Sequence, residues 1–197
     1  EESSVSLVSD SIFLNNQSSS GGGAYIGGFI SELTDCEFKG NKARYGGALV
    51  SGAFISTIRG CLLTENSATI GGGIVNHFLS STYYDTIFHK NHAVEHGGGL
   101  MLDSGSSVNL YNCLLSENSA TIAGAVSILG NQTEDRTTAE LHSCTVTQNF
   151  ASQSVGGICA MSDFSETSVK NCILWNNEHE QITSNTSVTV EYSNVQN

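Results

Sequence analysis

The stretch Cys36-Glu-Phe-Lys-Gly-Asn-Lys-Ala-Arg-Tyr-Gly-Gly-Ala-Leu49 is a repeat unit, and nearly all of the 197-residue chain can be read as edited copies of it. Each copy carries an asparagine that closes a Phe/Leu-x-x-Asn group and serves as an anchor for alignment. The anchors, 25 to 31 residues apart, are Asn16, Asn41, Asn66, Asn91, Asn118, Asn149 and Asn177. A period of this length with short apolar segments is typical of a solenoid of stacked β-coils. The sequence therefore predicts about seven coils.

Two columns of small and apolar residues precede the anchors. The third residue before each anchor is apolar: Phe13, Phe38, Leu63, Phe88, Leu115, Val146 and Leu174. The fifth is small, with Ser11 and Thr86 in two coils and a core Cys ladder in the others: Cys36, Cys61, Cys113, Cys144 and Cys172. Residues two apart point the same way in a strand. We therefore expect both columns to stack inside the solenoid.

Turn-forming residues separate the expected strands. A column of Asp, Asn, Ser and Gly lies six residues before the anchors, as at Asp35, and predicts a corner. Paired glycines after the anchors, as at Gly46, predict another bend because glycine allows positive φ and close approach of the backbone. Three strands per coil are expected. The longer stretches 128–141 and 177–188 are expected to be loops at one corner, where insertions into a solenoid are tolerated.

These patterns favour an all-β fold, a right-handed parallel β-helix that forms a single domain over residues 1–197. The chain contains no proline, which fits a backbone whose N–H groups nearly all donate within sheets. Stacked coils lie about 4.8 Å apart, so seven coils would form a rod on the order of 34 Å long. The anchor column is expected to be a structural Asn ladder, because an inward amide can bond both the turn backbone and the next asparagine.

The pairing of Phe38-Lys-Gly-Asn41 with Gly46-Gly-Ala-Leu49 resembles the repeat of the polymorphic membrane proteins of chlamydial surfaces and of related β-helix passenger domains of autotransporters. The closing stretch Asn171-Cys-Ile-Leu-Trp-Asn-Asn177 resembles the end coils of bacterial parallel β-helix repeat proteins. The resemblance covers roughly residues 11 to 177. It implies a right-handed β-helix, a surface or secreted setting and adhesion, and it supplies no catalytic residues to carry over.

The chain is acidic, with a formal net charge of −12. This charge repels phosphate backbones and anionic membrane surfaces, so nucleic acid is not an expected partner. No apolar run approaches about 18 residues, and direct membrane insertion is not expected. The first residues, Glu-Glu-Ser-Ser-Val, lack the basic and apolar regions of a signal peptide. We expect an excised or processed part of a longer surface protein, located outside the cell or on its surface.

The cysteines allow two interpretations. Six cysteines outside the cytosol would ordinarily indicate disulfides. Neighbours in the core Cys ladder, such as Cys36 and Cys61, should however have nearly parallel Cβ vectors, the wrong orientation for a relaxed disulfide. We therefore expect buried free thiols that pack as small hydrophobes, with disulfides as the alternative. Cys159 belongs to a different strand from the ladder.

No catalytic, cofactor-binding or metal-binding residues are expected. His89, His92 and His96 form the densest imidazole cluster, but they lack a known ligand spacing. Asp35 and Asp85 share one column, as the carboxylate pair of a carbohydrate-active enzyme would, yet turn geometry alone explains both. The outward residues Glu65, Lys90 and Glu117 are expected to form a weak charge ladder.

Three Asn-x-Ser/Thr sequons are present, at Asn16, Asn131 and Asn185. Asn16 belongs to the expected ladder and should not be modified. Asn131 and Asn185 lie in the two expected loops and are possible N-glycosylation sites. A flat ice-binding face would need a regular outward threonine array, and only Thr69 and Thr121 recur.

The sequence favours an extracellular, non-enzymatic β-helix module that acts as a surface adhesin or a structural spacer. Its expected partner is a protein or glycan of a host or neighbouring cell surface. A first alternative is a fibre subunit that binds copies of itself by end-to-end stacking. A second is a polysaccharide-binding or polysaccharide lyase-like protein. Variable outward residues, rather than those that define the repeat, are where partner contacts are expected.

Overall fold

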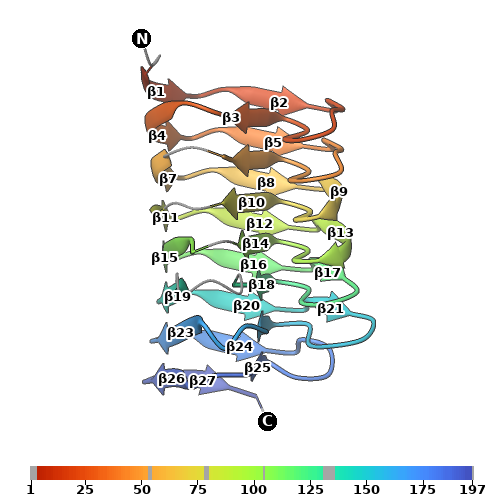
Figure 1. Cartoon of the computed structure of the whole chain (residues 1–197), viewed down its shortest axis with the longest axis vertical. Coiled ribbons are helices and arrows are strands. Elements are labelled where there is room, and N and C mark those ends of the chain that lie inside the picture. Colours follow the sequence, from red (N-terminus) through yellow and green to blue (C-terminus); the bar gives the residue numbers. More distant parts are fainter. Residues whose placement is uncertain (1–3, 53–54, 78–79, 104, 131–135, 197) are drawn as a thin grey trace.

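The structure is a computed structural model that describes residues 4–52, 55–77, 80–103, 105–130 and 136–196. The chain winds into a stack of coils, and its two ends lie at opposite ends of that stack (Figure 1). Strands of successive coils pair in parallel, as β1 (Ser4–Ser9) does with β4 (Phe29–Thr34). The predicted parallel β-helix is confirmed.

Three long sheets run along the stack within the described residues. Sheet A contains eight strands: β1, β4, β7 (Ile55–Arg59), β11 (Ser80–Tyr84), β15 (Ser107–Tyr111), β19 (Thr137–His142), β23 (Ser165–Lys170) and β26 (Val188–Glu191). Sheet B contains eight: β2 (Ile12–Leu14), β5 (Glu37–Lys39), β8 (Leu62–Thr64), β12 (Ile87–His89), β16 (Leu114–Ser116), β20 (Thr145–Thr147), β24 (Ile173–Trp175) and β27 (Asn194–Val195). Sheet D contains seven: β3 (Ala24–Ile26), β6 (Leu49–Ser51), β10 (Ile74–His77), β14 (Leu100–Asp103), β18 (Val126–Ile128), β22 (Ile158–Ala160) and β25 (Ile182–Ser184).

The prediction of three strands per coil is wrong for the middle coils, which have a fourth. Sheet C lies between sheets B and D along the chain, and its four strands are β9 (Ser67–Ile70), β13 (His92–His96), β17 (Ser119–Ala120) and β21 (Phe150–Ala151). These residues follow the anchor asparagines. They are extended because Ala68 and Ala93 pair in parallel and their small side chains are buried. The alanine column therefore forms a short strand as well as a tight turn.

The core is a set of columns in which each inward residue stacks on its counterpart in the next coil. Phe38 pairs with Phe13 on one side and with Leu63 on the other. The rings of Phe13 and Phe38 stack with their centroids 4.4 Å apart. Sheet D contributes Leu49, which pairs with Ile74. A shift of one residue would turn every inward side chain to solvent, so these columns hold the coils in register.

Each regular coil bends where single residues adopt a left-handed conformation. The predicted corner between sheets A and B is confirmed, with positive φ at Asp10, Asp35, Gly60, Asp85, Asn112, Ser143 and Asn171. The residue just before each anchor forms a second such column, which the sequence did not predict: Asn15, Gly40, Glu65, Lys90, Glu117, Gln148 and Asn176. A third precedes sheet D at Gly21, Gly46, Gly71, Gly97 and Ala123. Left-handed residues allow a sharp change of direction within one position.

The two expected loops have different outcomes. Residues 131–135 lie outside the described residues, and sheet A resumes at Thr137. The stretch 177–188 is not a loop throughout, because it contains β25. Ile182 pairs with Ile158 and continues an inward column of sheet D, which favours a strand at this point. Asn185 follows β25 at the corner between sheets D and A.

Candidate functional site

The anchor asparagines form a continuous hydrogen-bonded ladder. The Nδ2 atom of Asn91 donates to Oδ1 of Asn118 at 3.0 Å and to the carbonyl oxygen of Leu63 at 2.9 Å. The backbone N–H of Asn91 donates to the same Oδ1 at 3.0 Å. The pattern repeats from Asn41 to Asn149, where the asparagines are fully or almost fully buried. Each buried amide thus has partners in two neighbouring coils, which offsets the cost of its burial.

The two ends of the ladder differ. Asn16 belongs to the ladder, because it donates its Nδ2 to Oδ1 of Asn41 at 3.1 Å, but it is exposed in the first coil. At the other end Asn177 donates its Nδ2 to Oε1 of Gln181 at 2.6 Å. Gln181 is buried and takes the place that an eighth anchor would fill. Gln181 lies outside the repeat pattern, and sequence alignment did not identify it.

The core Cys ladder lies inside the corner between sheets A and B. All of its members and Cys159 are buried free cysteines. The Sγ atom of Cys61 donates to the carbonyl oxygens of Arg59 at 3.4 Å and Leu33 at 3.6 Å. Burial raises the pKa of the Cys61 thiol to about 12. Free thiols in solution stay a prediction, and fewer than four free groups on the denatured, unreduced protein would contradict it.

The histidines do not converge on one point. Nδ1 of His89 lies 3.0 Å from Oγ of Ser116, and Nδ1 of His92 lies 2.9 Å from Oγ of Ser119. His96 is half-buried at a β-bulge of β13. In the described part of the chain no group of three or more His, Cys, Asp or Glu side chains is arranged to hold a metal ion.

The candidate carboxylates have structural contacts. Asp35 and Asp85 both have a φ of 51° and form the left-handed bends between sheets A and B. Asp85 accepts a 2.7 Å hydrogen bond from Nδ2 of Asn112 and lies 3.6 Å from Nη1 of Arg59. In the expected charge ladder, Nζ of Lys90 lies 3.6 Å from Oε2 of Glu117 at the surface.

The sequons have separate environments. Asn131 lies outside the described residues. Asn185 is exposed, and its Nδ2 atom donates to the carbonyl oxygen of Met161 at 2.5 Å. Modification of Asn185 would require this hydrogen bond to break. Glycosylation at Asn131 and Asn185 stays a prediction.

The outer face of sheet D carries a feature that the sequence analysis missed. Val50, Val75 and Met101 alternate with inward residues and point away from the main core, yet they are buried. Tyr45 and Ile70 cover them from the neighbouring corner. One sequence pattern could have revealed this strip: an apolar column that follows the paired glycines, at positions where strand alternation predicts polar side chains. The corner therefore folds over one edge of sheet D.

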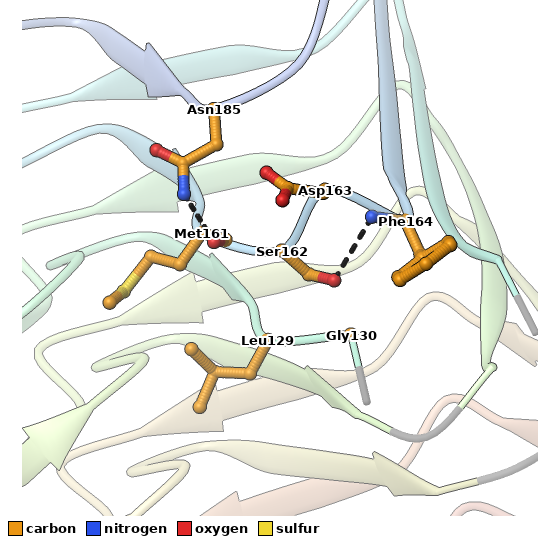
Figure 2. Close-up of a pocket in the computed structure, with 7 residues that line it drawn as sticks. All are labelled: Leu129, Gly130, Met161, Ser162, Asp163, Phe164 and Asn185. Atoms are coloured by element: carbon orange, nitrogen blue, oxygen red, sulfur yellow. Dashed lines mark hydrogen bonds between the residues drawn. The ribbon is translucent and has the colours of Figure 1, made fainter. Parts of the chain in front are cut away.

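Beside this covered strip lies an outward column at the end of the sheet D strands. It consists of Gly52, His77, Asp103, Leu129, Met161 and Asn185. Backbone hydrogen bonds from Leu129 to Leu102, from Met161 to Ile128 and from Asn185 to Ala160 keep these residues in step from coil to coil. Figure 2 shows Leu129, Met161 and Asn185 following one another in three successive coils.

Two hollows of about 530 Å³ each open along this column. The first is lined by Ser20, Tyr25, Tyr45, Val50, Gly52, His77 and Asp103. The second is lined by Leu129, Gly130, Met161, Ser162, Asp163, Phe164 and Asn185 (Figure 2). Asp103 lines the first hollow and Leu129 the second, and they follow β14 and β18, which pair in successive coils. We call these lining residues together the axial groove.

Some polar groups of the axial groove have defined partners. Nδ1 of His77 lies 3.6 Å from Oδ2 of Asp103, and both side chains are half-buried. Oγ of Ser162 accepts a 3.1 Å hydrogen bond from the backbone N–H of Phe164 and so orders the short loop that carries Asp163. The lining combines aromatic and aliphatic side chains with hydroxyl, imidazole, amide and carboxylate groups, so it offers both apolar contacts and hydrogen bonds to a ligand.

The geometry defines a β-helix whose repeat residues build the rod and whose variable residues line a groove on sheet D. A family model described as a right-handed beta helix region matches residues 1–155, and the chain belongs to this family. The right-handed parallel β-helix predicted from the repeats is therefore shown. No curated protein and no solved structure gives a significant match. Within the described ranges, no helix is long and apolar enough to cross a membrane.

Proposed function

We propose that this chain is an extracellular, non-enzymatic β-helix module that acts as a surface adhesin. The observation that carries the proposal is the axial groove, a recognition surface made from residues outside the repeat pattern. A rigid rod suits this role because its ladders hold the groove in one shape and reduce the ordering cost of binding. The resemblance of its repeats to those of chlamydial polymorphic membrane proteins and autotransporter passengers favours the same setting.

Binding of the fluorescently labelled protein to animal and bacterial cells tests the adhesin proposal. Saturable binding that excess unlabelled protein displaces is the expected result. A role as a structural spacer predicts no saturable binding to any cell type. Treating the cells with protease or with glycosidases then separates protein partners from glycan partners.

The fibre alternative is less well supported. End-to-end stacking would continue the Asn ladder only if Asn177 found its acceptor in the next copy, but Gln181 already supplies that acceptor. We therefore expect isolated short rods by electron microscopy at all protein concentrations. Filaments that lengthen with concentration would support the fibre instead.

The proposal of a non-enzymatic role rests on the contacts of the candidate acids. Asp35 and Asp85 occupy left-handed bends, where aspartate is favoured for backbone reasons. We expect no cleavage of neutral or acidic polysaccharides in the presence or absence of Ca²⁺, measured by mass spectrometry of the products. Shortened or unsaturated oligosaccharides would support the lyase-like alternative.

A further inference from the structure

We propose that the outer face of sheet B docks a basic amphipathic helix of a partner protein, which lies along the length of the stack. The contact surface is an outward column of sheet B that starts at Ile12 and ends at Ile173, which we call the apolar column. It belongs to a different sheet from the axial groove, so this inference goes beyond the adhesin proposal and does not rest on it.

The apolar column is continuous from coil to coil. Each long-sheet strand such as β12 places one inward residue, Phe88, between two outward ones, Ile87 and His89. Parallel pairing aligns the first outward residues of sheet B: Ile12, Glu37, Leu62, Ile87, Leu114, Thr145, Ile173 and Asn194. Five of these eight are isoleucine or leucine. Ile12, Ile87 and Ile173 are 69%, 37% and 49% exposed.

Strand formation does not require apolar residues at these places. Successive side chains of a strand point to opposite faces, so the outward ones contribute nothing to the core. An outward column of sheet A is polar in each of six coils: Glu32, Thr57, Thr82, Asn109, Glu140 and Ser168. Exposed apolar side chains that follow one another along one face mark an interaction site.

The shape of this face suits a helix rather than a strand. The inner strands of sheet B already hydrogen-bond to neighbours on both sides, so a strand laid on the face would leave its backbone without partners. A helix satisfies its own backbone and buries one apolar stripe against a sheet. The three residues of each strand span about 10 Å, close to the diameter of a helix.

The length of the column sets the length of the helix. Six strand pairings separate Ile12 from Ile173. With neighbouring strands about 4.8 Å apart, the column is roughly 29 Å long, which corresponds to about 19 residues of helix. The pitch of a helix, about 5.4 Å, is close to the coil spacing, so roughly one helical turn would face each coil.

Aromatic residues at the C-terminal end of the column provide anchors. Trp175 lies on the same strand as Ile173, and its side chain is also exposed. Tyr192 lies at the corner between sheets A and B in the last coil, where Asn171 is its counterpart one coil earlier. Tyr192 has a φ of 50° and is 89% exposed. The fold therefore places a bulky residue in an unfavourable conformation without burying it. Tryptophan and tyrosine contribute most often to binding at protein interfaces.

Acidic side chains beside the column define the charge of the partner. Asp10 and Asp35 are exposed at the adjoining corner, and Glu37 lies within the column. In the described ranges none of these three forms an ion pair. They outnumber Lys39, which lies in the second outward column of sheet B. A helix with basic residues beside its apolar stripe complements this surface, whereas a second copy of the chain, with its net charge of −12, is repelled.

Fluorescence anisotropy with the whole chain and a labelled synthetic peptide tests the inference. The probe is a peptide of about 19 leucine and lysine residues, in which the leucines recur at helical spacing and form one stripe. One comparison peptide has the same residues in scrambled order, and another has glutamate in place of every lysine. We expect the probe to bind saturably and to become more helical by circular dichroism. Both comparison peptides should bind at least about tenfold more weakly.

Substitutions in the chain locate the binding surface. Ile87→Thr keeps a β-branched residue on the strand but removes apolar contact, so it should weaken binding about three- to tenfold. Val94→Thr is its control, because Val94 is an exposed β-branched residue on sheet C. Asp35→Asn should weaken binding about two- to fivefold at low salt, and asparagine already forms this bend at Asn112. Its control is Asp163→Asn, which removes an exposed charge between β22 and β23.

Circular dichroism and thermal unfolding first establish that the variants fold, and Ile173→Thr serves as a second variant in the column. The inference is overturned if the probe does not bind, or if either comparison peptide binds as tightly as the probe. It is also overturned if Ile87→Thr and Ile173→Thr bind the probe as well as Val94→Thr does. Sedimentation equilibrium of the chain alone should show a monomer. A dimer that Ile87→Thr dissociates would assign the column to a second copy and overturn the helix.

Discussion

The side-chain amide of Asn177 donates a 2.6 Å hydrogen bond to Oε1 of Gln181, four residues further along the chain, and this contact ends the Asn ladder. The Nε2 atom of Gln181 returns a 3.3 Å hydrogen bond to the carbonyl oxygen of Asn177. One residue from outside the repeat therefore satisfies the last buried amide of the column.

Replacing this cap should destabilise the rod. Gln181→Leu keeps a similar volume but removes the acceptor of a buried donor, so we expect the free energy of unfolding to fall by about 1–3 kcal/mol. Urea unfolding followed by circular dichroism measures the change. Gln153→Leu is the control, because Gln153 is exposed in a nearby turn. Equal effects of the two substitutions would show that Gln181 has no special role.

The left-handed column before the anchors offers a stabilising substitution. Gln148 is exposed and has a φ of 56°, a conformation that costs roughly 1–2 kcal/mol for residues other than glycine. Gln148→Gly should raise the free energy of unfolding by about 1 kcal/mol, and Gln148→Val should lower it, because β-branched residues are worst in this region. Thermal unfolding midpoints in the opposite order would contradict the assignment of this bend.

Tyr83 has a hydroxyl group that the fold does not use. Its side chain is fully buried, and the hydroxyl has no hydrogen-bond partner among the described residues. Burial also raises the pKa of Tyr83. Tyr83→Phe should leave the stability unchanged or raise it by up to about 1 kcal/mol, because a buried unpaired polar group is removed. A clear decrease in the free energy of unfolding of Tyr83→Phe, measured with urea, would indicate that the hydroxyl has a hydrogen-bond partner.

The buried thiols predict a loss of stability at alkaline pH. The pKa of Cys61 rises from 9.0 to about 12 on burial. A raised pKa favours the folded state fully below the pKa of the unfolded thiol, and this contribution is lost as pH rises from about 9 towards 12. For Cys61 the loss is about 1.4 kcal/mol per pH unit.

Urea unfolding between pH 8 and pH 11 tests this prediction. Above pH 9, the free energy of unfolding of Cys61→Ala should fall less steeply with pH than that of the wild type, because the variant lacks one of the thiols that ionise on unfolding. If the free energy of unfolding falls equally steeply with pH in the two proteins, the pKa of Cys61 is not strongly raised.

Much of the fold could be predicted because each coil repeats the same physical requirements. Phe38, Asn41 and Gly46 recur at fixed offsets, and residues at one offset stack in space, so alignment identified the inward columns and two of the bends. The bend at Lys90 was missed because Glu, Lys and Gln at this position resemble an ordinary exposed column. Gln181 was missed because it substitutes for a repeat residue at a different offset.

The axial groove was harder to predict. Leu129 and Asn185 line the same hollow but are 56 positions apart and chemically unlike. No shared motif connects them, and only the register of sheet D brings them together. Residues under selection for packing repeat from coil to coil, whereas residues that contact a partner need not.

The central claim is that the anchor asparagines act as one cooperative column that holds the groove-bearing rod in shape. Native-state amide hydrogen exchange measured by NMR tests it directly. The backbone N–H groups of the five buried anchors from Asn41 to Asn149 donate to the next Oδ1 at 2.9–3.1 Å: Asn41, Asn66, Asn91, Asn118 and Asn149. We predict that all five exchange only through global unfolding, with opening free energies within about 1 kcal/mol of the total stability. Rapid exchange of these amides by independent local opening would contradict the account.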